Sequence, residues 1–378
     1  MWKIFTLALT SLMSLTLHGQ ISHPILPLGS PAPNFVLPGV DGKTHKLSDY
    51  ASSRVLVVIF TCDHCPIAQM YESRTEKLYE DYGNRGVAIV AIQGNDPNAT
   101  TIDELDSSDM GDTLPEMKIR AQYKHLHYPY LSDGADQSAT RAYGPQATPH
   151  VFIFDKDRRL RYQGRFDNSY RIEKVKTNDA RNAIDALLEN KPVPVTQTAV
   201  FGCSTKWREK EALRVAAEQK LDAQPISVNL VDAAALKKLR ANAGDNYTLV
   251  AFWATWCTSC VAEFSDLQDT FRMYSDRGFN LVTVSVNTPD EKQSVLRLLE
   301  KKHATSRNLL FASDDTAALQ AAFDPKWQSA VPYTVLLGPN GKVLYSSLGS
   351  VDILQLRRTI LAAMPSDYIG FNKYWTAQ

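Results

Sequence analysis

Two apolar runs in this chain each end in a C-x-x-C motif that precedes helical periodicity, and this order limits the folds the chain can adopt. Residues 55–60 lead into the motif at 62–65, and residues 248–253 lead into the motif at 257–260. Uninterrupted apolar runs with β-branched residues are typical of central strands that are buried on both faces. Each motif therefore lies where a buried strand gives way to a helix.

The segments after the two motifs follow the same order. Each motif is followed by a predicted helix, a second buried strand, further helices, and a closing strand, turn, strand and helix. The helices next to the motifs are expected at 64–82 and 257–274, and the second strands at 87–92 and 279–286. Strands that alternate with helices predict an α/β fold, and the closing hairpin adds antiparallel strands to a parallel sheet. We therefore expect two mixed sheets flanked by helices, in tandem.

A length of 378 residues suits two domains. We predict a first domain at 27–190 and a second at 225–365. Between them, 191–224 is predicted to be a linker that opens with a stiff Pro-Val-Pro stretch and contains a charged helix around 206–221.

The first twenty residues have the pattern of a secretory signal peptide. Lys3 supplies a weak positive charge, and residues 4–17 are mostly apolar before polar sequence begins at His18. An uncleaved anchor is the alternative, but the stretch is shorter than the roughly 20 apolar residues that span a bilayer. We expect export to the periplasm or the extracellular space, where disulfides persist. The formal net charge is zero, so we expect no nucleic-acid partner.

A dithiol at the start of a helix suits disulfide exchange. The nucleophile is the thiolate, and the unpaired N–H groups at a helix N-terminus favour the anion. We expect Cys62 and Cys257 to be exposed attackers, with Cys65 and Cys260 as partly buried resolving thiols. His64 can carry positive charge near neutral pH and stabilise the Cys62 thiolate. We therefore expect the first site to be the more oxidising, with the lower nucleophile pKa.

Two other readings of the cysteines stay open. Two C-x-x-C pairs can hold zinc, but pairs in one zinc module are usually roughly 15–20 residues apart, whereas these are separated by almost two hundred. Each pair can also be a merely structural disulfide. We expect no metal and no bound cofactor, because the sulfurs themselves carry the electrons. The fifth cysteine, Cys203, is in order of preference a buried thiol, a third redox partner or a dimer link.

A proline precedes a strand downstream of each motif. Thr148-Pro149 follows the first motif and Val331-Pro332 follows the second. A cis peptide at this point would bring the preceding residue beside the dithiol, where its backbone could pair with an extended substrate segment. An ordinary strand-initiating proline is the alternative. We predict that these four residues bind substrate.

The second half resembles the thioredoxin family. Residues 253–260 (Trp-Ala-Thr-Trp-Cys-Thr-Ser-Cys) and the later Val331-Pro332 are closest to the exported TlpA/ResA-like thiol-disulfide reductases. The resemblance implies a thioredoxin-like fold over about 225–365. Ala251 stands where cytoplasmic thioredoxins carry a buried aspartate, so proton handling must differ. Asp290 or Glu291 could supply a carboxylate, although a solvated helix N-terminus is slightly favoured.

The first half resembles the redoxin group of the peroxiredoxin-like (AhpC/TSA) families. The resemblance rests on residues 29–35, 60–66 and 143–149, and residues 201–207 are similar to a tail segment that follows such domains. It implies a second thioredoxin-like fold. Peroxiredoxins place a threonine three residues before the peroxidatic cysteine, and Cys62 occupies that place if Cys65 is the counterpart. The departure favours exchange chemistry over peroxidase chemistry.

Two further groups of residues invite a metal-site interpretation. His125 and His127 lack a clear third ligand and are expected to be surface or packing residues. The aspartates of the acidic loop lack the glycine and bidentate glutamate of a calcium loop, so a solvated loop is expected; they are Asp103, Asp106, Asp109 and Asp112.

The sequence therefore predicts an exported thiol-disulfide oxidoreductase. Its expected partners are protein thiols and disulfides together with an electron donor that the sequence does not define, and export is compatible with a membrane redox partner. The alternatives are a thiol peroxidase of the peroxiredoxin-like antioxidant kind, and a peptide-binding module without essential redox chemistry.

Overall fold

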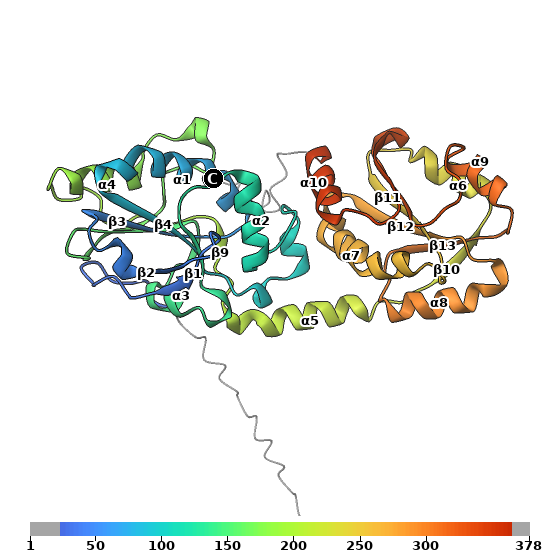
Figure 1. The fold of residues 1–378 in the computed structure, drawn as a ribbon, viewed down its shortest axis with the longest axis horizontal. Helices are drawn as coiled ribbons and strands as arrows, with labels where there is room; N and C mark the ends of the chain where they lie inside the picture. The colour runs from blue at the N-terminus through green and yellow to red at the C-terminus, as the bar shows by residue number, and fades with distance from the viewer. Residues whose placement is uncertain (1–22, 365–378) are drawn as a thin grey trace, which may run out of the picture.

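The computed structural model of the chain describes residues 23–364 and forms two units side by side (Figure 1). The predicted signal peptide at 1–20 lies outside the described residues. No helix within residues 23–364 is both long and apolar enough to cross a membrane.

The first unit is built on a five-stranded mixed sheet in the order β5-β4-β3-β7-β8. The strands are β3 (Val55–Thr61), β4 (Val87–Gln93), β5 (Tyr130–Ser132), β7 (His150–Phe154) and β8 (Leu160–Gly164). β3, β4 and β5 are parallel, whereas β7 and β8 form an antiparallel hairpin on the other side of β3. The motif at 62–65 therefore follows the carboxyl end of the central strand.

The second unit repeats this arrangement with one more strand, in the order β10-β13-β12-β11-β14-β15. The strands are β10 (Val228–Val231), β11 (Tyr247–Trp253), β12 (Phe279–Ser285), β13 (Arg307–Phe311), β14 (Tyr333–Leu337) and β15 (Val343–Leu348). The first four in this order are parallel and the last two antiparallel. The predicted fold class, two mixed α/β sheets in tandem, is confirmed.

Helices cover both faces of the first sheet because β3 is buried on both sides. Val55, Val57 and Ile59 face α1 (Pro66–Tyr82) and α4 (Asp179–Leu188). The alternate residues of β3 face α3 (Ser138–Tyr143) and the small hairpin of β1 (Val36–Pro38) and β2 (Thr44–Lys46). α2 (Leu114–Lys124) packs beside β4 and β5. A strand with alternating positions on two cores is what the apolar run predicts.

The second sheet is covered in the same way. α7 (Thr258–Tyr274) and α10 (Ile353–Ala363) pack on one face, and α6 (Ala233–Ala241) and α9 (Thr316–Phe323) pack on the other. α8 (Lys292–Lys301) closes the end near the second dithiol. β10, α6 and β13 were not predicted from the sequence, because their apolar stretches are short, and those of β10 and α6 are also partly exposed.

The segment predicted as a linker is divided between two roles. Residues 197–207 pack back on the first unit, where β9 (Cys203–Ser204) pairs antiparallel with β6 (Ala147–Thr148). Only α5 (Glu211–Asp222) then runs along the edge of the molecule towards the second unit, as Figure 1 shows. The sequence pattern did not indicate this return, because a two-residue pairing has no periodicity.

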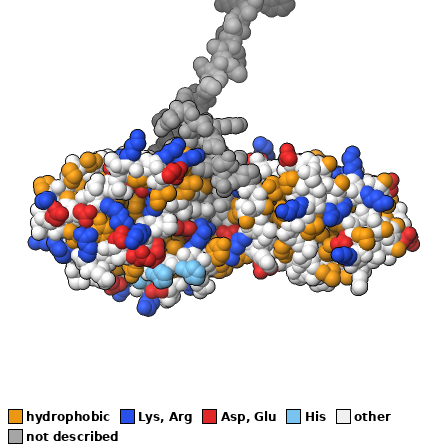
Figure 2. All heavy atoms as spheres, turned by 90° about the horizontal axis from the view of Figure 1, so that it is seen from above, with side chains coloured by type: hydrophobic (Ala, Val, Ile, Leu, Met, Phe, Trp, Pro, Cys, Tyr) orange, Lys and Arg blue, Asp and Glu red, His pale blue; other side chains and the backbone are white. Residues whose placement is uncertain are grey.

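The two units touch through the acidic loop of the first. The 3-10 helix at Ile102–Leu105 packs on α7, and Tyr274 donates a hydrogen bond to the carbonyl of Ser108 at 2.7 Å. Asp109 accepts a hydrogen bond from Arg358 of α10 at 2.7 Å. Figure 2 shows acidic and basic side chains interspersed over both units on the face that it displays.

Candidate functional site

The first dithiol lies at the start of α1. Cys65 is the residue before the helix, and Pro66 takes the first helical position, where no backbone N–H is needed. Cys65 is fully buried and Cys62 is only 2% exposed. The expectation that Cys62 is an exposed attacker is therefore wrong for this structure, because residues 201–206 cover the edge on which it lies.

Three sulfurs meet in the first unit. Cys203 stands opposite Thr148 in the β6–β9 pair, and the thiols of Cys62 and Cys203 both hydrogen-bond to the Cys65 sulfur. The Sγ of Cys62 lies 3.2 Å from the Thr148 hydroxyl, and the Sγ of Cys65 lies 3.7 Å from the Thr148 carbonyl oxygen. Cys65 is thus the central sulfur, with one neighbour from its own motif and one from the returning strand.

The surroundings of the three sulfurs favour the thiolate form of Cys65 over those of Cys62 and Cys203. Burial alone raises the pKa of Cys65, but the hydrogen bonds from Cys203 and Cys62 and the charge of His64 outweigh it and hold that pKa well below its usual value. Burial raises the pKa of Cys62 well above its usual value, and the hydrogen bond to Cys65 raises the pKa of Cys203. The expected lowered pKa at Cys62 is therefore not found; the thiolate is favoured one helical turn further on.

His64 is held by Asp112. The Nδ1 of His64 lies 2.5 Å from a carboxylate oxygen of Asp112, and the other oxygen accepts the backbone N–H groups of Asp63 and His64 at 2.8 and 3.1 Å. Asn95 donates a further hydrogen bond to Asp112 at 3.2 Å. Asp112 is only 3% exposed. The expectation of a solvated loop is wrong for Asp109 and Asp112, which are buried partners rather than surface charges.

The two buried groups shift each other's pKa. Burial alone lowers the pKa of His64, but the charge of Asp112 and the hydrogen bond outweigh it and raise that pKa. Burial alone raises the pKa of Asp112, but His64 outweighs it and lowers that pKa. Together with Cys62 these groups could offer three ligands to a metal ion, but the short hydrogen bond already uses two of the atoms.

The second dithiol is an intramotif disulfide between Cys257 and Cys260. Cys257 caps α7, and its sulfur accepts the N–H of Cys260 at 3.2 Å. Cys257 is 7% exposed and Cys260 is 1% exposed. Trp256 is 65% exposed beside them. Cys257 is thus the more exposed sulfur of the pair, beside a surface that presents a large aromatic ring, but it is buried, so the expectation of an exposed attacker is not met here either.

Both predicted prolines follow cis peptide bonds, Thr148-Pro149 and Val331-Pro332. Thr148 contacts both sulfurs of the first motif, and Val331 packs against the buried cluster that contains Cys257 and Cys260. The structure thus brings each predicted substrate-binding pair next to its dithiol. Whether they bind substrate stays a prediction.

The remaining candidates lie outside the two dithiols. Glu291 accepts hydrogen bonds from the N–H and hydroxyl of Thr288, so its carboxylate caps a helix start, as the favoured interpretation held. His125 and His127 are exposed, and His127 pairs with Glu76 at 2.8 Å. Ala251 is buried under α7 and α10. These histidines are surface residues, as expected.

Sequence reasoning missed the residues that hold the first site from a distance. Asp112 was taken as part of a solvated loop, and Asn95 and Lys206 were not singled out. The N–H of Lys206 donates to Asn95 at 2.8 Å, which joins the returning strand to the support of Asp112. The available signals were a histidine inside a C-x-x-C motif, whose ring nitrogens need hydrogen-bond partners when they are buried, and an unpaired fifth cysteine.

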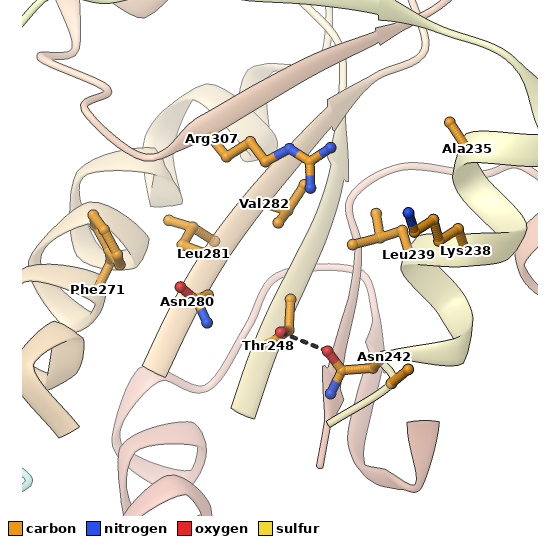
Figure 3. A pocket seen from close by; sticks show the side chains of 11 residues that line it. Ala235, Lys238, Leu239, Asn242, Thr248, Phe271, Asn280, Leu281, Val282 and Arg307 are labelled. Atoms are coloured by element: carbon orange, nitrogen blue, oxygen red, sulfur yellow. Dashed lines mark hydrogen bonds between the residues drawn. The ribbon is translucent and has the colours of Figure 1, made fainter. Parts of the chain in front are cut away.

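A large pocket lies away from both dithiols. It has a volume of about 790 Å³ and lies between α6 and the first residues of β11 and β12 (Figure 3). Thr248 donates a hydrogen bond to Asn242 across one side of it at 2.8 Å. Thr248 begins β11, whereas Cys257 follows its end, so the pocket lies at the opposite end of the strand from the second dithiol.

A mixed sheet with a C-x-x-C motif at the start of a helix and a cis-proline beside it defines a protein of the thioredoxin-like class, here present twice. The family model described as AhpC/TSA family matches residues 28–163 and 200–346. The chain belongs to the AhpC/TSA family.

Curated relatives carry the name thiol-disulfide oxidoreductase ResA. The chain is 27% identical over 136 residues to the protein of Geobacillus thermodenitrificans, covering 35% of this chain and 67% of that one. It is 28% identical over 132 residues to the protein of Geobacillus kaustophilus, covering 34% of this chain and 64% of that one. The match thus spans about two thirds of these relatives. The predictions of family and of enzyme class, an oxidoreductase, are confirmed at this level.

Solved structures also resemble parts of the chain. A hypothetical protein of Sinorhizobium meliloti 1021 is 35% identical, with a TM-score of 0.43, over 49% of this chain and 96% of that one. An uncharacterized conserved protein of Geobacillus kaustophilus is 35% identical, with a TM-score of 0.44, over 50% of this chain and 95% of that one.

Proposed function

We propose that the chain is an exported thiol-disulfide oxidoreductase whose two dithiols exchange disulfides with protein clients. The observation that carries the proposal is the second site, where the outer sulfur of Cys257 caps α7 beside exposed Trp256 and the cis-proline edge at Val331. The relatives named as thiol-disulfide oxidoreductases support the same chemistry. We propose that the first dithiol carries out the same exchange, although both of its sulfurs are buried.

The exchange at the second site needs only sulfur chemistry. In the reduced state the Cys257 thiolate attacks a client disulfide, one client sulfur leaves as a thiolate, and a mixed disulfide forms. Cys260 then attacks Cys257, the client leaves with its second thiol, and the Cys257–Cys260 disulfide closes. An external thiol donor must reduce this disulfide for another cycle. With an oxidised starting site the same steps run in reverse and oxidise a client dithiol.

The test is reduction of a protein disulfide by the full chain in a thiol buffer. We expect Cys257→Ser to lose most of the activity, whereas Ser265→Ala, which removes an exposed hydroxyl further along α7, keeps it. A chain that carries Cys65→Ser and Cys257→Ser together and still acts on clients at the wild-type rate would contradict redox chemistry and favour peptide binding.

A second candidate function is a thiol peroxidase at Cys65. The favoured thiolate lies at Cys65, at the start of α1, where the resemblance to peroxiredoxins places the peroxidatic cysteine. A Cys65 thiolate would reduce a peroxide to an alcohol or water and become a sulfenic acid, which a neighbouring thiol condenses to a disulfide with loss of water. Consumption of hydrogen peroxide that disappears in Cys65→Ser but persists in Cys257→Ser would support this function.

The proposed place of action is the periplasm or the extracellular space, which rests on the N-terminal pattern of residues 1–20. Its test is N-terminal sequencing of the protein recovered from an exporting cell. A start near residue 20 is expected, and an intact Met1 in the cytoplasmic fraction would contradict export. In that compartment the expected partners are protein thiols and disulfides, an electron donor and a membrane redox protein.

A further inference from the structure

The segment that returns from the end of the first unit occupies the edge where a client would pair. Cys203 and Ser204 form the two-residue antiparallel strand β9 against Ala147 and Thr148. Thr148 is the residue before the cis-proline, whose backbone is the edge expected to take an extended client segment. The chain therefore places one of its own cysteines where the cysteine of a client would lie.

The segment 201–206, here called the strap, is fixed on both sides of Cys203. The ring of Phe201 packs against those of Tyr71 and Tyr170, with centroids 6.4 and 6.5 Å apart. On the other side Lys206 donates its N–H to Asn95, and its carbonyl accepts a hydrogen bond from Gln137 at 2.9 Å.

The side chains of the strap complete this attachment. The Lys206 ammonium group pairs with Glu104, and the hydroxyl of Thr205 donates to the carbonyl of Pro145 at 2.7 Å. Buried polar contacts of this kind hold a segment in one place only when each is satisfied. Cys203 is thus presented to Cys65 by an ordered segment, not by a loose tail.

The order of the sulfurs decides which exchange the cluster allows. The Sγ of Cys65 lies 3.7 Å from the carbonyl oxygen of Thr148, the residue that stands opposite Cys203 in the β6–β9 pair, and Cys65 interacts with both Cys62 and Cys203. In thiol–disulfide exchange a sulfur attacks one member of a disulfide and the other member leaves. The central sulfur is the one that can be bonded to either neighbour, and here that sulfur is Cys65.

We propose that Cys203 is a third redox thiol of the first unit, which exchanges with the Cys62–Cys65 disulfide to form a Cys65–Cys203 disulfide. The Cys203 thiolate attacks Cys65, the Cys62–Cys65 bond breaks, the Cys65–Cys203 bond forms, and Cys62 leaves as a thiolate that takes up the proton given up by Cys203. One disulfide is lost and one is formed, so no further oxidant is consumed.

The exchange has a consequence for client access. When Cys65 is bonded to Cys203, the strap is covalently fixed over the Thr148 edge and clients are kept from it. When Cys62 and Cys65 are bonded to each other, the strap is held only by its non-covalent contacts and can release the edge. This inference rests on the proposed function, because a low-molecular-weight or client disulfide must first oxidise the Cys62–Cys65 dithiol.

The test is disulfide mapping of the full chain. The reduced protein is oxidised with glutathione disulfide, quenched in acid, alkylated, cut with trypsin and analysed by mass spectrometry. Residues 55–74 carry both Cys62 and Cys65 on one tryptic peptide, and residues 182–206 carry Cys203. We expect these two peptides to be linked, with fragmentation between Asp63 and His64 that assigns the bond to Cys65.

The matched control moves the thiol by one place. In the double variant Cys203→Ser and Ser204→Cys the strap keeps one thiol, but on the exposed side of the strand. We expect the linked pair to be lost in this variant. A linked pair that persists in this variant at the wild-type level would overturn the proposal. The disulfide would then form by random encounter of the thiols and would not depend on the position of Cys203 beside Cys65.

Two further outcomes separate this inference from the proposed function. A Cys62–Cys65 disulfide with Cys203 always alkylated would overturn the third-thiol role and leave the exchange function of the first dithiol intact. Cys62, Cys65 and Cys203 all alkylated after oxidation, while Cys257 and Cys260 are bonded, would contradict the proposed function of the first dithiol and this inference with it. A bond from Cys203 to Cys62 would overturn the assignment of Cys65 as the central sulfur.

Discussion

Gly202 is the residue at which the strap can be displaced without removing a sulfur. Its φ is +137°, and a Cβ added there would lie 2.1 Å from the carbonyl oxygen and 2.9 Å from the carbonyl carbon of Thr148. Backbone atoms cannot yield as a flexible side chain can, so in Gly202→Ala the strap must move away from Thr148 by about 1 Å to restore van der Waals contact. A non-glycine residue in this backbone region costs a further 1–3 kcal/mol or so.

We therefore expect Gly202→Ala to lower the free energy of opening the strap by about 2 kcal/mol, which is roughly a 30-fold rise in the open fraction. Buried thiols react with an alkylating agent through such openings. The assay is the alkylation rate of Cys203 in the reduced full chain, followed by mass spectrometry. The rate is expected to rise roughly 30-fold, because each 1.4 kcal/mol or so is a factor of ten.

The matched control is Gly42→Ala. Gly42 also has a positive φ, of +81°, but no heavy atom lies within 4 Å of the added Cβ. It belongs to the turn between β1 and β2, away from the strap, so Cys203 should react at the wild-type rate. An unchanged Cys203 rate in Gly202→Ala, or an equal rise in both variants, would refute the reasoning that the contact with Thr148 positions the strap.

Three other predictions follow from the site and the junction. Asp112→Asn keeps an oxygen for the backbone N–H groups but removes the charge, so the pKa of His64 should fall and the pKa of Cys65 should rise. The pH midpoint of Cys65 alkylation should therefore move upward. A midpoint that stays or falls would count against the ion pair. In the wild type the pKa of His64 is raised above 6.5, so the stabilisation that protonated His64 gives the fold is fully present below pH 6.5 and is lost as the pH rises through the folded pKa. The thermal unfolding temperature of Asp112→Asn should therefore differ most from that of the wild type below pH 6.5. Arg358→Ala removes a hydrogen-bond partner of Asp109 and should lower the free energy of separating the two units by about 1–3 kcal/mol. Limited proteolysis between the units should become faster. Arg297→Ala, which changes an exposed arginine of α8, should be cleaved at the wild-type rate.

The strand-to-helix junctions could be predicted because their sequence patterns lie in consecutive residues. The apolar run at 55–60, the motif after it and the helical spacing beyond it need only local periodicity, and the same holds at 248–260. The two cis-prolines were recognisable because each recurs at a similar place relative to its motif. These features placed both dithiols and their proline neighbours correctly.

The support of the first site could not be predicted in this way. Asp112 reaches His64 from a loop 48 residues further along the chain, and its charge in the sequence is no different from that of its exposed neighbours. Cys203 reaches Cys65 only because residues 197–207 turn back over the sheet. Cys62 is buried in the fold, and within its motif the lowered pKa lies at Cys65 and not at Cys62.

The order of the two reduction potentials remains a prediction with a new physical reason. Reduced Cys65 is stabilised as a thiolate by two thiol donors and His64, whereas Cys257 has a backbone N–H and the Ser259 hydroxyl at 3.5 Å. A stabilised reduced form makes the disulfide the stronger oxidant. The first unit should therefore have the higher potential.

If each unit holds its own redox couple, a redox titration of the full chain should resolve both couples. The protein is equilibrated in thiol–disulfide buffers between about −350 and −120 mV and alkylated. The alkylation of each cysteine-containing peptide is then measured by mass spectrometry. We expect two separate two-electron transitions, one at Cys257 and Cys260 and one in the cluster that contains Cys65. Cysteines of the first unit that stay fully alkylated across the whole range, while the second unit titrates, would contradict this expectation.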